Sequence, residues 1–424
     1  MAIFGQIGYV VWLFYSPFSK RNPVSIQSST TDFDDIRPYD DHEVRPTLDR
    51  ILREPELGLA IASFKFPRLT RALPWLMGPL VRLVLKRQLV AVNSVDDLQR
   101  IVKDYIDRML AESGTELSSS GLEKLEKDRA YLFVSNHRDI AMDPAFVNWM
   151  LFSGGFHTLR IAIGDNLLTK PYVSDLMRLN KSFIVNRSAQ GPRQKFKAAK
   201  RLSAYIHHSI VGEGANNWIA QREGRAKDGR DKTNSAIVGM FALNKPKPMA
   251  FGDYIKELNI VPVSISYELD PCDAAKAREL HAHRTDGDYE KDEHEDVDSI
   301  AAGIVGKKGR VHVAFGDVLD GDFDSADQVV AELDRQIIDN YVLQASNCLA
   351  YEQQTGEPVA LNYGAQQQPF AASAESAMQA ILAERLEALP AEHRDLVLDM
   401  YANPVKSKRE QLDAAELPSA PAQS

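Results

Sequence analysis

The stretch Tyr131–Pro144, YLFVSNHRDIAMDP, places a short apolar run directly before a polar turn. The run YLFVS has the length and composition of a buried strand. Asp143 before Pro144 has the form of a helix N-cap followed by proline at the first helical position, so we expect a helix to begin there. His137 then lies in the turn between a strand and a helix, a typical place for a catalytic group in an α/β fold.

Short apolar runs alternate with helical stretches after Gly121, and this alternation predicts an α/β domain. The expected strands are Ala130–Ser135, Leu159–Gly164, Ser182–Val185, Asn217–Gln221, Ile260–Tyr267 and Val311–Phe315. The expected helices are Val95–Glu112, Pro144–Phe152, Pro171–Leu179 and Arg193–His208. Pro262 interrupts one strand pattern; because proline has no amide donor, it predicts an edge, a bulge or a strand start.

Length, net charge and cysteine content limit the classes of protein to which the chain can belong. The chain has 424 residues, enough for about two or three structural units. Its net charge of -9 does not favour a nucleic acid as partner. Cys272 and Cys348 are its only cysteines, too few for a disulfide framework or a cysteine-rich zinc site. A reducing compartment is the natural setting, so we expect the cytoplasm.

The segment Phe64–Gln88 carries six basic residues and no acid in an otherwise acidic protein. Its apolar residues, Trp75 and Leu80 among them, would form one face of a helix, and a basic amphipathic stretch suits an anionic lipid surface. The alternative is a set of core helices with a solvated basic face. The apolar patch Tyr9–Tyr15 is too short to span a bilayer. No other stretch reaches the about 18 consecutive apolar residues that a membrane-spanning helix needs. We therefore expect the protein on a membrane surface or in solution.

These patterns divide the chain into four predicted regions. Residues 1–49 form an amino-terminal segment, partly disordered, in which Ser25–Asp49 is a loosely ordered connection. Residues 50–120 form a helical, membrane-associating region, and residues 121–320 the α/β domain. Residues 321–424 form a carboxy-terminal helical region with helices at Ala326–Leu349 and Ala372–Leu389 and a disordered tail.

His137 and Asp143 are candidates for a catalytic pair. If the turn folds back, the Asp143 carboxylate can hold one imidazole nitrogen while the other takes a proton from a substrate hydroxyl. The protein would then need no nucleophile of its own. The alternative is that Asp143 is only a helix cap and His137 an ordinary loop residue.

Two further strands are followed by arginines. Arg187 comes just after Ser182–Val185, while Arg222 and Arg225 flank Glu223 and Gly224 after the strand Asn217–Gln221. Arginine binds phosphate oxygens in bidentate fashion, and glycine lets the backbone approach a ligand closely. Glu223 could orient the arginines. For any one of these arginines, a surface salt bridge is the alternative.

The segment His281–Asp298 is crowded with charged residues. His281, His283 and His294 suggest a metal site, but the surrounding charges are explained more simply by a solvated excursion of the chain. We predict no metal here.

Four blocks in this order resemble the glycerol-phosphate acyltransferase superfamily, which contains glycerol-3-phosphate and 1-acylglycerol-3-phosphate acyltransferases. The blocks are NHRDIAMDP, SFIVNR, QREGRAKDG and IVPVSISYE, and together they cover about Tyr131–Glu268. The resemblance implies a mixed sheet flanked by helices, with an amino-terminal helical region and a helical carboxy-terminal tail. It also implies an enzyme of phospholipid synthesis, peripheral on the inner face of the cytoplasmic membrane.

The resemblance implies a reaction and a set of residues. A fatty acyl group would pass from acyl-CoA or acyl carrier protein to a hydroxyl of glycerol 3-phosphate or 1-acylglycerol 3-phosphate, with no cofactor and no metal. His137 would be the general base and Asp143 would orient it. The residues expected to hold or shape the phosphate site are Arg187, Arg222, Glu223, Gly224 and Arg225.

One departure from the family pattern concerns the first block. The family usually has four residues between the histidine and the aspartate, whereas five lie between His137 and Asp143. Asp139 is a competing partner, but Pro144 and the helix after it favour Asp143. The altered spacing leaves a second hypothesis, a lipid-binding protein on the same scaffold that has lost catalysis. An unrelated α/β hydrolase ranks last because the sequence has no G-x-S-x-G nucleophile elbow.

Overall fold

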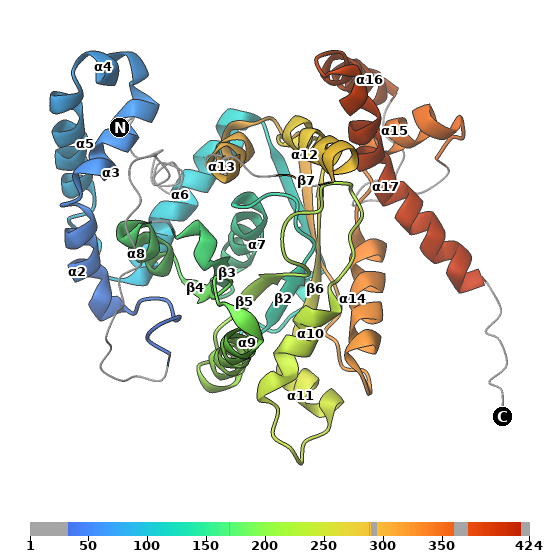
Figure 1. Ribbon diagram of the computed structural model, residues 1–424, viewed down its shortest axis with the longest axis horizontal. Coiled ribbons are helices and arrows are strands. Elements are labelled where there is room, and N and C mark those ends of the chain that lie inside the picture. Colours follow the sequence, from blue (N-terminus) through green and yellow to red (C-terminus); the bar gives the residue numbers. More distant parts are fainter. Residues whose placement is uncertain (1–32, 169, 288, 290–294, 360–371, 417–424) are drawn as a thin grey trace.

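The structure, a computed structural model, describes residues 33–168, 170–287, 289, 295–359 and 372–416. Within them, seven strands form one sheet in the order β1-β7-β6-β2-β5-β3-β4 (Figure 1). All neighbouring strands are parallel except β6 and β7, which are antiparallel. The predicted mixed sheet is therefore confirmed. The strands are β1 (Glu116–Ser120), β2 (Leu132–Ser135), β3 (Arg160–Gly164), β4 (Ser182–Val185), β5 (Asn217–Ala220), β6 (Ile260–Tyr267) and β7 (Arg310–Phe315).

Helices cover both faces of the sheet. Side chains of β2 alternate between the two faces, as a strand requires: Phe133 packs with one cluster of buried residues, Leu132 and Val134 with another. The first cluster is supplied by α6 (Val95–Ser113), α7 (Met142–Ser153) and α13 (Glu295–Val305). The second is supplied by α9 (Gly191–His207), α10 (Ser235–Phe241), α11 (Phe251–Glu257) and α14 (Ala326–Asn340).

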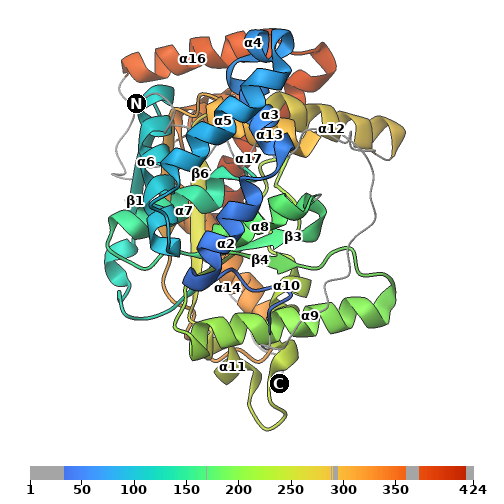
Figure 2. The ribbon, with the colours of Figure 1, turned by 90° about the vertical axis from the view of Figure 1, so that its left-hand side faces the viewer.

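The amino-terminal helices form a separate apolar cluster with α8 (Pro171–Leu179). They are α2 (Asp41–Ile51), α3 (Pro55–Lys65), α4 (Pro67–Ala72) and α5 (Pro74–Gln88). Helices α3 and α5 approach closely at Gly58, where a Cβ atom would lie 2.4 Å from the Gly78 carbonyl oxygen. This group of helices lies along the left side of the molecule in Figure 1 and faces the viewer in Figure 2.

The expected loose connection Ser25–Asp49 is wrong where the structure describes it, because α2 begins at Asp41. Asp40 and Glu43 form a capping box at its start, which satisfies amides that would otherwise lack partners. Val44 and Leu48, one turn apart, are buried against the neighbouring helices. The polar composition of this segment therefore belongs to a helix cap and an exposed helix face.

The carboxy-terminal region also differs from expectation. The predicted helix Ala326–Leu349 is broken, because Gln344 and Asn347 form a capping box that starts α15 (Ala345–Thr355). After α16 (Ala372–Glu387), the long helix α17 (Ala391–Glu416) packs against α15 and α12 (Asp273–Asp286). The segment predicted as a solvated excursion begins on a helix, since His281 and His283 lie on α12, where His283 is exposed. His294 lies outside the described residues.

Pro262 lies on an interior strand, so the expectation of a sheet edge is wrong. The ladder between β6 and β7 begins only at Val263, which pairs with Phe315. The Pro262 carbonyl accepts a hydrogen bond from the Gly316 amide at 2.8 Å. In an antiparallel pair the nitrogen and the carbonyl of one residue face the same neighbour, so the Pro262 nitrogen also faces the chain that follows β7, beyond the last paired residues. The proline is tolerated because the pairing of β6 with β7 does not include this position, so the amide hydrogen that proline lacks is not needed there.

The sheet contains a strand that was not expected from the sequence. β1, ELSSS, is too polar to resemble a strand, and it precedes the predicted start of the domain at residue 121. It pairs with β7, and Ser118 and Ser120 contact the two ring nitrogens of His312, each at 2.9 Å. Among the described residues, no helix is long and apolar enough to cross a membrane. The apolar patch Tyr9–Tyr15 lies outside them.

Candidate active site

His137 and Asp143 are joined directly. The Nδ1 atom of His137 lies 2.8 Å from Oδ2 of Asp143. The Asp143 side chain is fully buried, and the His137 side chain is 13% exposed. Because Nδ1 faces the carboxylate, Nε2 is the ring nitrogen that can exchange a proton with a substrate. The fifth intervening residue therefore does not separate the pair.

Asp143 is fixed by several donors. Its Oδ2 atom accepts from the backbone amides of Arg138 at 2.6 Å and Asp139 at 2.9 Å. Its Oδ1 atom accepts from the Tyr267 hydroxyl at 2.6 Å. Burial and the nearby Asp143 charge raise the pKa of Tyr267 well above its usual value, so this hydroxyl remains a donor. A carboxylate with these partners stays in one orientation and holds the imidazole in one tautomer.

The competing carboxylate, Asp139, has a different task. Its Oδ1 atom accepts from the amides of Ala141 and Met142, at 3.0 and 2.9 Å. The helix α7 begins at Met142 with Ala141 as N-cap, so the expectation that Asp143 is the N-cap is wrong. Asp139 satisfies the first amides of the helix, which frees Asp143 to face the histidine.

The glycine-arginine loop, QREGRAKDG at residues 221–229, lies against the turn that carries His137. The Ala226 amide donates to the His137 carbonyl at 2.8 Å. Behind it, the buried Arg138 guanidinium donates to Asp231 at 2.6 Å, and the Asn136 side chain donates to the same carboxylate at 3.0 Å. These bonds hold the first sequence block against the third block and against Asp231, which lies two residues beyond the end of the third block.

The predicted cationic residues lie around one cavity. Arg225 is buried and donates to Ser299 Oγ at 3.2 Å, while its other terminal nitrogen has no hydrogen-bond partner among the described residues. Arg187 is half-exposed and lies 3.5 Å from Glu223. Glu223 therefore accompanies Arg187; no ion pair between it and Arg222 or Arg225 occurs in the described part of the chain.

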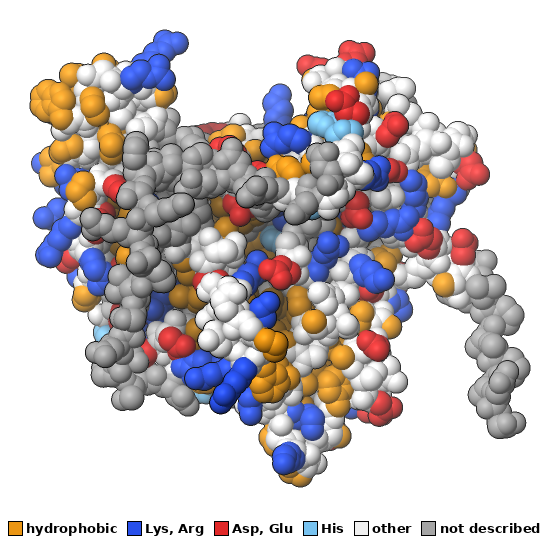
Figure 3. All heavy atoms as spheres, in the orientation of Figure 1, with side chains coloured by type: hydrophobic (Ala, Val, Ile, Leu, Met, Phe, Trp, Pro, Cys, Tyr) orange, Lys and Arg blue, Asp and Glu red, His pale blue; other side chains and the backbone are white. Residues whose placement is uncertain are grey.

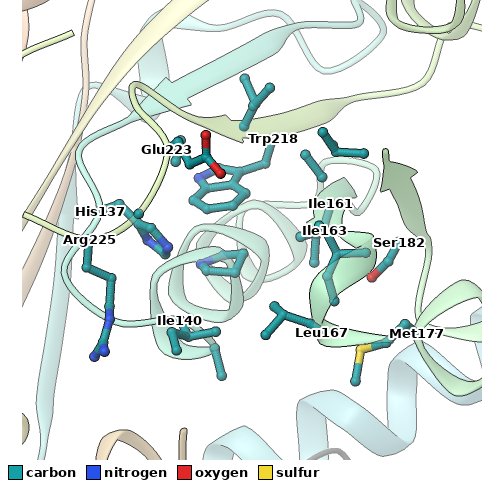
Figure 4. A pocket seen from close by; sticks show the side chains of 18 of the residues that line it. His137, Ile140, Ile161, Ile163, Leu167, Met177, Ser182, Trp218, Glu223 and Arg225 are labelled. Carbon is teal, nitrogen blue, oxygen red and sulfur yellow. The ribbon is translucent and has the colours of Figure 1, made fainter. Parts of the chain in front are cut away.

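The cavity has a volume of about 690 Å³ and joins these residues to the histidine. It is bordered by His137 and by each of the five predicted phosphate-site residues, whereas Asp143 lies behind the histidine, away from its surface. Figure 4 shows that His137 and Arg225 border one side of this cavity. The opposite side is apolar and contains Ile161, Ile163, Leu167 and Met177. A polar head and an apolar chain could therefore occupy one continuous space.

Trp218 and Lys195 are among the cavity residues that the sequence analysis did not single out. The Trp218 ring stands edge-on to the His137 ring, with centroids 5.7 Å apart, and its Nε1 donates to Ser135 Oγ at 3.0 Å. Trp218 was assigned only to a strand, although a tryptophan three residues before Gln221 in a strand ending at the site was a usable signal. Lys195 of α9 also borders the cavity. Within the described residues no cluster of three or more His, Cys, Asp or Glu could hold a metal ion.

Comparisons with known proteins bear on residues 116–266, which match the sequence model of the Acyltransferase family. No curated protein matches. Among solved structures, the chain is similar to the 1-acyl-sn-glycerophosphate (LPA) acyltransferase PlsC from Thermotoga maritima. The two are 12% identical with a TM-score of 0.29, over 56% of this chain and 79% of that one.

The family match covers all but the last residues of the four blocks that predicted it. The blocks begin at Asn136 and end at Glu268, two residues beyond the matched segment. The match over residues 116–266, less than half of the chain, therefore supports the predicted resemblance to acyltransferases and an enzyme of the acyltransferase type.

Proposed function

We propose that the protein moves a fatty acyl group from an acyl thioester to a hydroxyl of glycerol 3-phosphate or 1-acylglycerol 3-phosphate. The observation that supports this most strongly is the joint position of the His137–Asp143 pair and of Arg187, Arg222 and Arg225 around one cavity. A base and a group of arginines that border one cavity suit an acceptor that carries both a hydroxyl and a phosphate.

In this proposal His137 Nε2 removes the proton of the acceptor hydroxyl as the oxygen attacks the thioester carbonyl carbon. Asp143 stabilises the imidazolium that forms. When the tetrahedral intermediate collapses, the C–S bond breaks and the imidazolium returns the proton to the departing thiolate. The products are an ester and a free thiol, and the histidine is neutral again.

The phosphate would lie against the arginines. The buried Arg225 supplies a guanidinium nitrogen without a partner among the described residues, which favours an anionic ligand over an empty site. Gly224 has a φ of 73°, and no atom lies within 4 Å of the point where a Cβ would stand, so the loop backbone is open to the ligand. The acyl chain would occupy the apolar side beyond Ile161 and Met177.

A membrane contact through α3–α5 completes the proposal. Met77, Val81 and Leu85 are buried, but Trp75 is 72% exposed and Leu80 is also exposed. Figure 3 shows hydrophobic side chains gathered over α4 at the upper left. Exposed apolar side chains beside basic residues suit a peripheral position on an anionic bilayer, and we place it on the cytoplasmic side.

Thiol release by the purified protein tests the reaction. With palmitoyl-CoA, addition of glycerol 3-phosphate or 1-acylglycerol 3-phosphate is expected to release free thiol and form the ester, whereas glycerol without phosphate is expected to give at least tenfold less. His137→Ala is expected to abolish transfer. Transfer that is undiminished in His137→Ala would refute the general base, and absence of transfer to either phosphorylated acceptor would refute the acceptor class.

A further inference from the structure

Helix α9 is a basic element in an acidic chain. Its sequence GPRQKFKAAKRLSAYIH contains five Lys or Arg residues and no Asp or Glu, while the whole chain carries a net charge of -9. A local positive surface of this kind attracts anionic partners that the rest of the molecule repels.

The basic residues on the first turns of α9 form no ion pairs within the described part of the protein. Arg193, Lys195, Lys197 and Lys200 are exposed, and none has an ion pair within the residues that the structure describes. Arg201 differs, because it pairs with Asp35. Figure 3 shows Lys and Arg side chains gathered over α9 in the lower part of the view.

Only one face of α9 borders the catalytic cavity. The α9 residues that line it are Lys195, Ala198, Ala199 and Leu202, at the spacing of a single helix face. Arg193, Lys197 and Lys200 do not line it. Their charge is therefore presented outside the cavity, beside the point where Lys195 links the cavity to the surface.

An exposed aromatic ring lies among these charges. Phe196 is 58% exposed, and it does not line the cavity. Large exposed aromatic side chains surrounded by charge are typical of protein interfaces, where the ring supplies buried area and the charges supply steering.

The basic face of α9 is remote from the proposed membrane contact. In both views α4 lies at the top of the molecule and α9 in its lower part, above α11, and the two views share their vertical axis (Figures 1 and 2). A bilayer that contacts the exposed side chains of α4 and α5 therefore does not reach α9 at the same time.

We propose that Arg193, Phe196, Lys197 and Lys200 form the docking surface for an acidic acyl carrier protein that delivers the acyl thioester. The inference rests on the proposed function and specifies its donor. A carrier protein is large enough to cover cations that face away from the cavity, while its thioester-bearing arm enters past Lys195. Of the α9 cations, Lys195 is the one that lines the cavity, whereas Arg193, Lys197 and Lys200 lie outside it.

The test compares two donors with the same acyl chain, palmitoyl-acyl carrier protein and palmitoyl-CoA, in the full-length protein. For Lys197→Glu with Lys200→Glu, kcat/KM with the carrier-protein donor, divided by kcat/KM with palmitoyl-CoA, is expected to fall at least tenfold, through KM. Binding of fluorescently labelled carrier protein, followed by anisotropy, is expected to weaken to the same degree and to weaken further at high salt.

The matched control is Arg284→Glu with Lys307→Glu, which makes the same change in net charge at exposed positions outside α9. It is expected to leave the donor ratio within twofold of the unchanged protein. The docking surface would be overturned if kcat/KM fell equally with both donors or if the two double variants changed the donor ratio equally. It would also be overturned if the carrier protein did not bind the unchanged enzyme. Absence of transfer from both donors would instead count against the proposed function.

Discussion

At the level of single residues, the orientation of the buried Asp143 carboxylate is fixed by three hydrogen-bond donors besides the histidine. In the proposed mechanism this arrangement orients His137 and stabilises its charged form during transfer. Asp139 is also buried, but its Oδ1 atom accepts hydrogen bonds from the start of α7. The two neighbouring carboxylates therefore offer a comparison between orienting the base and capping a helix.

Asp143→Asn is expected to lower kcat by roughly 10³-fold or more, with KM for the acceptor within about threefold, because the amide no longer holds the correct imidazole tautomer. Asp139→Asn keeps an oxygen that can accept from the helix amides, so we expect a loss of less than tenfold. Steady-state kinetics of both variants provide the measurement. Similar losses in the two would show that Asp143 acts only in folding.

His312 gives a prediction about pH. Burial lowers the pKa of this imidazole to about 4, against an ordinary value of 6.5. The folded state therefore keeps His312 neutral while the unfolded state binds a proton, so stability is fully present above pH 6.5 and is lost as the pH falls toward 4. Relative to pH 7.5, this group alone is expected to lower the free energy of unfolding by about 2 kcal/mol at pH 4.5.

The comparison variant is His312→Gln, which cannot titrate and can still bond to Ser118 or Ser120. Urea unfolding of both proteins at the two pH values separates this contribution from that of the carboxylates, which both proteins share. The variant is expected to lose less stability on acidification. An equal loss in the two proteins would mean that His312 is protonated in the folded state at pH 4.5.

At the level of elements, α17 contacts the glycine-arginine loop although it lies outside the matched residues 116–266. The Asn403 side chain donates to the Asp228 carbonyl at 2.6 Å. A Cβ atom at Gly229, whose φ is 78°, would lie 2.1 Å from the Met400 carbonyl oxygen, so only glycine allows this approach. The carboxy-terminal helix is therefore part of the support for the loop that carries Arg225.

Asn403→Ala removes the side-chain donor and is expected to raise KM for the phosphorylated acceptor about fivefold, since one hydrogen bond contributes about 1 kcal/mol to the loop position. KM for the acyl donor is expected to change less than twofold. Lys406→Ala, which removes an ion pair with Asp399 inside α17, is the control. If both variants raise both KM values alike, α17 has only a general structural role.

In the whole molecule, α4, whose neighbourhood carries exposed apolar side chains, lies at the top, and α9 lies in the lower part (Figure 2). The cavity lies between them, since its lining comes from α6 and α8 as well as α9. An amphiphilic product could leave toward the bilayer while a water-soluble donor approaches from the other end.

Trp75→Ser combined with Leu80→Ser is expected to weaken binding to vesicles containing anionic phospholipid by at least tenfold. The reason is that each large apolar side chain contributes about 1.5–3 kcal/mol when it leaves water. Co-sedimentation with vesicles measures the effect. Leu412→Ser, at an exposed position on α17, is the control and is expected to change nothing. Binding equal to that of the unchanged protein would rule out α5 as the contact.

The sequence by itself determined six of the seven described strands, because alternating apolar runs bounded by polar turns reflect burial between two helical layers. It also singled out His137, Asp143 and the arginines, since polar groups at the carboxyl ends of neighbouring strands meet at one edge of a sheet. β1 was not predicted because ELSSS has no apolar pattern. Its position in the sheet depends on pairing with β7 and on contacts with His312.

Only the tertiary structure decided how these residues act together. It assigned Asp139 to the helix start and Asp143 to the histidine, a choice that depends on the path of the turn and not on spacing. It also separated buried Met77 from exposed Trp75 on one helix, and it brought α17 against the glycine-arginine loop. Contacts between residues far apart in the chain depend on packing, which a local sequence pattern does not contain.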